Sequence, residues 1–189
     1  AKQRIYPKNA VRAVRAWRAS LEKADVVPDA QQLRIIDVVI ERLVLEANEE
    51  EQDAVGRNDA EPTRMFVHGL PGSGKSRIIT WLQTLFTEVL GWTSGVEFQT
   101  AAPMNSMAAL VNGVTLHSAS RLGQDLVAGK HAGGKFYRRP NELFTDLQNR
   151  RWMLIDDVEN ASAELLAAVN KQHCDASRTG HRSYARRLD

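Results

Sequence analysis

The sequence predicts an α/β fold, in which a parallel β-sheet is flanked by helices and preceded by an N-terminal helical segment. Apolar segments of strand length at residues 65–68, 96–101 and 152–155 alternate with segments of helical periodicity. This alternation is typical of a parallel sheet. A glycine-rich loop joins the first of these strands to a helix, and the last strand ends in two aspartates. The alternation, the loop and the paired acids together predict the fold class.

Composition excludes several classes of protein. The chain has 189 residues, of which 43% are hydrophobic and 25% charged, which fits one ordinary domain with a small appendage. No apolar run approaches the roughly 18 residues needed to span a bilayer, so no membrane association is expected. A single cysteine excludes an internal disulfide framework. We expect an intracellular protein, in the nucleus or mitochondrion if eukaryotic and otherwise in the cytoplasm. Because the first residue is Ala, we also expect a fragment of a longer chain.

Residues 1–27 are expected to form a basic helical segment. Seven of the first 23 residues are Lys or Arg, and only one is acidic. Apolar residues recur at helical spacing over residues 10–23, with Arg12, Arg15 and Arg18 on the adjoining side. This basic stripe either contacts DNA or a partner, or is a solvated helix face. We favour the solvated face.

Residues 28–189 are expected to form the main domain. A strong amphipathic helix follows Pro28 and Asp29, and the acidic stretch 48–63 is expected to be an exposed loop. The expected elements after it are strand 65–68, helix 76–90, strand 96–101, short helix 103–111, loop 129–135, helix 140–149, strand 152–155 and helix 161–172.

The strongest motif is GLPGSGKS at residues 69–76, which matches G-x-x-x-x-G-K-[ST] in full. Glycines let backbone N–H groups converge on an anion, and the following helix directs its N-terminus to the same place. Lys75 supplies a charge for the β- and γ-phosphates, and the Ser76 hydroxyl is a ligand for Mg²⁺. The motif predicts a P-loop NTPase that uses ATP and Mg²⁺. Its expected nucleotide-binding residues are Gly69, Pro71, Gly72, Ser73, Gly74, Lys75, Ser76 and Arg77.

Two acids follow the apolar segment at residues 152–155. In a parallel-sheet nucleotide site, an acid at the end of a neighbouring strand holds Mg²⁺ through its water shell, and we assign this role to Asp156. Asp157 would orient or deprotonate the attacking water. Lys75, Asp156 and Asp157 are therefore the expected catalytic residues. The alternative for Asp156 is a helix N-cap.

Several separated segments together resemble the first RecA-like motor domain of the Pif-type (petite integration frequency) DNA helicases of superfamily 1, including their helitron-associated relatives. PDAQQLRII at residues 28–36 resembles the glutamine motif of the family, with Gln32 as the residue that reads adenine and Gln31 as the fallback. Residues 100–118 resemble its A-P-T-G-x-A-A and G-x-T-x-H-S element, and residues 151–166 resemble its motif II with the following helix.

The resemblance implies an ATP-dependent helicase that translocates 5′ to 3′ on single-stranded DNA. It implies a second RecA-like domain as partner, and roles in DNA repair, recombination or telomere maintenance. The implied DNA-binding residues are Pro103, Asn105, Thr115 and His117. A second candidate for DNA contact is the basic loop at residues 130–139, which includes Phe136 and Tyr137.

One departure from the family pattern bears on catalysis. Motif II of the family reads Asp-Glu, whereas this chain has Asp156 and Asp157. Aspartate is one methylene shorter, so its carboxylate retracts by about 1 Å, and a misplacement of that size can lower a rate about 100-fold. Three hypotheses stay open: a helicase motor domain, a different P-loop ATPase such as an AAA-type loader, and a degenerate remnant that binds nucleotide or DNA without turnover.

Overall fold

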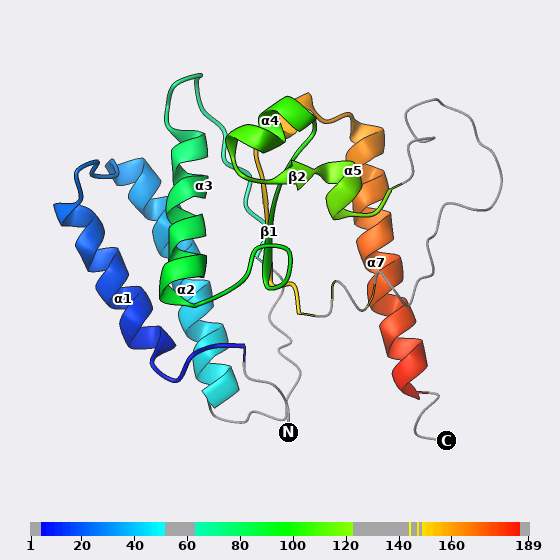
Figure 1. The fold of residues 1–189 in the computed structure, drawn as a ribbon, viewed down its shortest axis with the longest axis horizontal. Helices are drawn as coiled ribbons and strands as arrows, with labels where there is room; N and C mark the ends of the chain where they lie inside the picture. The colour runs from blue at the N-terminus through cyan, green and yellow to red at the C-terminus, as the bar shows by residue number, and fades with distance from the viewer. Residues whose placement is uncertain (1–4, 52–62, 123–143, 145–146, 148, 186–189) are drawn as a thin grey trace. The chain divides into compact units, whose positions relative to one another are not determined.

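A computed structural model of the chain describes residues 5–51, 63–122, 144, 147 and 149–185, with side chains to residue 174. The chain divides into two compact units, Ala1–Thr93 and Ser94–Asp189 (Figure 1). The expected loop 129–135, the basic loop 130–139 and most of the expected helix 140–149 lie outside the described residues.

The described part of the first unit is helical. Its longest helix, α2, packs against α1 and α3, and α1 also contacts η2. The expected helices at residues 10–23 and 76–90 are confirmed, each ending in a turn of different helical pitch. The elements of this unit are α1 (Ala10–Ser20), the 3-10 turn η1 (Leu21–Lys23), α2 (Ala30–Glu51), α3 (Lys75–Thr84) and the π-helical turn η2 (Leu85–Val89).

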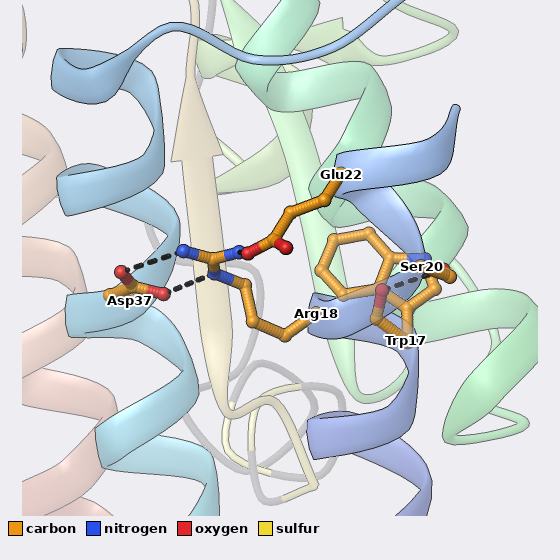
Figure 2. Close-up of polar contacts among 5 residues, drawn as sticks. All are labelled: Trp17, Arg18, Ser20, Glu22 and Asp37. Carbon is orange, nitrogen blue, oxygen red and sulfur yellow. Dashed lines mark hydrogen bonds and ion pairs between the residues drawn. The ribbon is translucent and has the colours of Figure 1, made fainter. Parts of the chain in front are cut away.

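Arg18 joins α1 to α2. Its Nε donates to Asp37 Oδ1 at 2.5 Å and its Nη2 to Asp37 Oδ2 at 3.2 Å, while Nη1 pairs with Glu22 at 3.4 Å (Figure 2). The hydrogen bond to Asp37 is the main cause that raises the pKa of Arg18. Arg12 and Arg15 are exposed, as expected for a solvated face. The expectation was wrong for Arg18, because a carboxylate on the neighbouring helix engages it.

Helix α2 extends further than expected. The acidic loop expected from residue 48 begins no earlier than the end of α2 at Glu51. The Glu50 carboxylate accepts hydrogen bonds from the backbone amides of Ile5 at 2.9 Å and Tyr6 at 2.8 Å. This contact spans more than 40 positions in sequence, so the local pattern of acidic residues could not reveal it.

Residues 65–68 were expected to form a strand, and this expectation was wrong. They carry no regular secondary structure, and Met65 and Phe66 are exposed. The Phe66 ring instead stacks on His68, with ring centroids 6.3 Å apart. A strand exists only where a neighbouring strand accepts its backbone hydrogen bonds. The apolar pattern of the segment does not reveal whether such a partner is present.

The described part of the second unit contains a three-stranded parallel sheet in the order β2-β1-β3. The strands are β1 (Phe98–Ala102), β2 (Val114–Thr115) and β3 (Trp152–Ile155). Every residue of the central strand β1 is buried, whereas the residues of β3 are half-buried. The expected strands at 96–101 and 152–155 are confirmed to within two residues, and with them a small parallel sheet.

Helices flank this sheet. A buried cluster joins Ala101 of β1 to Leu116 and Ala119 of α5 and to Val169 of α7, and α4 contacts β1 and β2. The expected short helix at 103–111 is confirmed, and the expected helix at 161–172 continues to residue 185. The helical elements of this unit are α4 (Asn105–Leu110), α5 (Leu116–Ala119), the 3-10 turn η4 (Val158–Asn160) and α7 (Ala163–Ala185).

Candidate nucleotide-binding site

The loop at residues 69–76 folds as a tight turn that leads directly into α3. Gly72 and Gly74 both have a φ of 80°, in the left-handed region that favours glycine. The Ser73 amide donates to the Leu70 carbonyl at 3.1 Å, which closes the turn. Gly74 is the N-cap of α3. The glycines of the motif therefore stand where the backbone conformation requires them.

The turn leads into the N-terminus of α3, whose first hydrogen bonds return to Gly74. The amides of Arg77 and Ile78 both donate to the Gly74 carbonyl, at 3.1 and 3.3 Å. In any helix, the amides of the first turn have no acceptor within the helix and point out along its axis. The partial positive charge of a helix N-terminus adds to this arrangement and favours an anion.

The Lys75 ammonium lies over the loop. Its Nζ is 2.9 Å from the Gly69 carbonyl oxygen and 3.4 Å from the Leu70 carbonyl oxygen. The side chain is therefore folded back across the turn, where its charge adds to the helix N-terminus. Pro71, Gly72 and Ser73 are exposed, so a ligand can reach the loop.

Gln32, the residue expected to read adenine, contacts the loop at residues 69–76. Its Nε2 donates to the Ser73 carbonyl at 3.2 Å, and a Cβ placed on Gly74 would lie 2.4 Å from that Nε2. Its Oε1 accepts from the Asp29 amide at 2.9 Å. Gln31, the fallback, is exposed, and its backbone amide donates to Asp29 Oδ1 at 2.8 Å.

Ser76 and Arg77 are exposed positions in the first turn of α3. The Arg77 guanidinium lies 6.0 Å from the centroid of the Trp81 ring, one turn further along the helix. This cation–π contact was not expected from the sequence, although four-residue spacing on a helix is the signal that could have revealed it.

The residues of this loop fit a polyphosphate. Ammonium, helix N-terminus and glycine turn form a donor set that matches the oxygens of phosphate groups. The Ser76 hydroxyl lies at the start of α3, where it fits a hard cation that takes oxygen ligands.

In the second unit, several expected residues lie at the carboxyl edge of the sheet. The Asp156 amide donates to the Ala101 carbonyl at 2.9 Å, which continues the pairing of β3 with β1. Ala102, the last residue of β1, pairs with Thr115, the last residue of β2. Pro103 follows β1 directly. In parallel sheets this edge is where ligands bind.

Asp156 and Asp157 differ in their surroundings. Asp156 is buried, with 7% of its surface exposed. Asp157 is half-buried and adopts φ 48° and ψ 40°, the left-handed conformation, as the N-cap of η4. Aspartate and asparagine tolerate this conformation better than most other residues with a side chain. The backbone turn thus gives a structural reason for aspartate at this position.

The Thr115 to Ser118 element has local structural roles. Thr115 is the N-cap of α5, and its Oγ1 accepts the Ser118 amide at 3.2 Å. A Cβ on Gly113 would lie 2.6 Å from the Thr100 carbonyl oxygen, so only glycine fits there. His117 is half-buried on α5, and Asn105 is exposed at the start of α4. These contacts account for Gly113 and Thr115 without DNA.

A polar pair in this unit was missed from the sequence. The buried Ser120 hydroxyl lies 3.1 Å from Nε2 of His173, which joins the end of α5 to α7. Burial, and then the charge of Arg150, lowers the pKa of His173 below its ordinary value of 6.5. The 53 positions between the two residues left no local signal.

Searches of the chain against protein-family models, curated proteins and solved structures returned no match. Within the described ranges, no helix combines the length and the apolar character that crossing a membrane requires.

Proposed function

We propose that this chain binds Mg·ATP at residues 69–76 and hydrolyses it to translocate on single-stranded DNA, as the first motor domain of a Pif-type helicase. One observation carries the nucleotide-binding part. The Lys75 ammonium lies 2.9 Å from the Gly69 carbonyl, above two glycines with a φ of 80° and beside the start of α3. This arrangement suits an anion with several oxygens.

Each residue has a role in this proposal. Lys75 binds the β- and γ-phosphates, and Ser76 and Asp156 hold the magnesium ion. The ion, when bound, neutralises charge that develops on the transferred phosphoryl group. Asp157 orients or deprotonates the attacking water. Its left-handed conformation supports a functional role, because residues in sparsely populated backbone conformations cluster at active sites.

Pro103, Asn105, Thr115 and His117 are the proposed DNA contacts. Pro103 and Asn105 follow the carboxyl end of β1. Thr115 is the last residue of β2, and His117 follows it on α5. Exposed Asn105 is available for a phosphate. The proposed partners are single-stranded DNA and a second RecA-like domain, and the proposed processes are DNA repair, recombination and telomere maintenance.

A second candidate is a remnant that binds nucleotide without turnover. Asp157 favours it, because the aspartate carboxylate is shorter than that of the glutamate in the family motif. An AAA-type loader would also suit the loop at residues 69–76. Both alternatives keep nucleotide binding and differ in catalysis or in the response to DNA.

Phosphate release from ATP, measured with and without single-stranded DNA, separates these functions. We expect DNA to stimulate turnover by the wild-type chain. Turnover that DNA does not change would favour a loader. No turnover, with Mg·ATP still bound, would favour the remnant. Asp157→Glu would then raise the rate if the site is otherwise intact, and no gain would again favour the remnant.

A further inference from the structure

We propose that Gln32 is a positioning residue that sets the conformation of the phosphate loop through the Ser73 carbonyl, and that it does not read the base of the nucleotide. This inference rests on the proposed nucleotide-binding function. It departs from the role that the resemblance implies for this residue.

Both ends of the Gln32 carboxamide are engaged within the first unit. Its Oε1 accepts the Asp29 amide at 2.9 Å, while Asp29 Oδ1 accepts the Gln32 amide at 2.9 Å. This reciprocal pair is a capping box at the start of α2. The Nε2 donates to the Ser73 carbonyl at 3.2 Å. An amide reads adenine with its oxygen and nitrogen together, and here the oxygen is tied to α2 and the nitrogen to the loop.

The contact with Ser73 acts on the part of the loop that a phosphate would meet. A peptide group is planar and trans, so the Gly74 amide points away from the Ser73 carbonyl of the same group. Because Gln32 holds that carbonyl, it also sets the direction of the Gly74 amide. Gly74 in turn receives the first hydrogen bonds of α3, from Arg77 and Ile78.

The Gln32 carboxamide also lies close to Gly74, whose φ of 80° already favours glycine. A Cβ on Gly74 would lie 2.4 Å from Gln32 Nε2, whereas a Cβ on Gly72 would meet no atom within 4 Å. Both glycines have a φ of 80°, so backbone conformation alone does not distinguish them. The carboxamide is packed against the turn at the very start of α3.

Binding of three ligands tests the proposal in the full chain. ATP, GTP and inorganic tripolyphosphate are titrated, each with Mg²⁺, into wild type and Gln32→Met, which has similar length and no amide. We expect all three affinities to fall by the same factor, about 5-fold for the loss of one hydrogen bond. Glu41→Gln, a change at an exposed position further along α2, should stay within about 2-fold of wild type. A loss confined to ATP, or no loss at all, would overturn the proposal.

Hydrogen exchange of the loop amides without ligand tests the tether separately from nucleotide binding. Gln32→Glu keeps the acceptor for Asp29 and removes the donor to Ser73, so the cap of α2 is retained. We expect faster exchange over residues 69–76 in Gln32→Glu than in Glu41→Gln. Equal exchange in the two variants would overturn the tether. If wild type binds none of the three ligands, the proposed function is wrong, and the inference about Gln32 is then also wrong.

Discussion

At the residue scale, Gly72 and Gly74 form a matched pair within one loop. Both have a φ of 80°, but only Gly74 is approached by another side chain, that of Gln32. Gly72→Ala should therefore introduce left-handed strain alone, about 1–2 kcal/mol. Gly74→Ala should introduce the same strain and also displace Gln32. We expect Mg·ATP affinity to fall further in Gly74→Ala than in Gly72→Ala, as measured by calorimetry. Equal losses would show that the Gln32 contact does not matter.

Asp157 combines a left-handed backbone conformation with a proposed catalytic role. Asp157→Asn should retain the stability of the second unit, because asparagine also tolerates a φ of 48°. ATP turnover should fall sharply, because the amide cannot accept a proton from water. Phosphate release and thermal unfolding measure the two effects. Glu159→Gln, a change at an exposed carboxylate two residues away, is the control. Wild-type turnover in Asp157→Asn would exclude the proposed role of Asp157.

Much of the candidate site could be predicted at this scale from local sequence. The glycines, Lys75 and Ser76 lie within eight consecutive residues, so their spacing alone predicted the turn and the start of α3. The partner of Gln32 could not be predicted, because Ser73 is 41 positions away. Asp157 was expected from its place after an apolar strand, but its left-handed backbone has no signature in the residue type alone.

At the element scale, the contact between Ser120 and His173 makes the attachment of α7 sensitive to pH. The pKa of His173 is lowered in the folded protein, so protonation favours the unfolded state. The contribution of His173 to the free energy of unfolding should be fully present above pH 6.5 and should decrease as pH falls toward the folded-state pKa. His173→Gln, which keeps a polar partner for Ser120, should lose this component. Urea unfolding of wild type and His173→Gln, from above pH 6.5 downward, measures the pH-dependent contribution of His173. An unchanged pH dependence in the variant would contradict the assignment.

The strands show where the local pattern of apolar residues was sufficient to predict secondary structure. The four apolar residues of β3 predicted a strand, and β1 supplies the partner that makes it one. Residues 65–68 have a similar pattern, yet they form no strand. The end of α2 was misplaced for a related reason, because Glu50 engages the backbone of residues 5 and 6. In both cases contacts with residues far away in the sequence decide the outcome, and the local pattern does not contain them.

At the scale of the whole molecule, the proposed function requires a magnesium ion, and Asp156 is one of its proposed ligands. Asp156→Asn should therefore weaken ATP binding in the presence of Mg²⁺ by about 10-fold, the worth of one charged ligand. Without Mg²⁺ the change should be smaller. Glu159→Gln is again the matched control. Equal losses with and without Mg²⁺ would separate Asp156 from the ion.

The measurement that tests the central claim most directly is a calorimetric titration of Mg·ATP into the wild-type chain and into Lys75→Ala. We expect saturable binding of one nucleotide per chain, weakened about 10- to 100-fold when the charged hydrogen bonds of Lys75 are lost. Thermal unfolding of both proteins without ligand shows whether the variant is folded. No binding by wild type, or the same affinity in folded Lys75→Ala, would contradict a nucleotide site at residues 69–76.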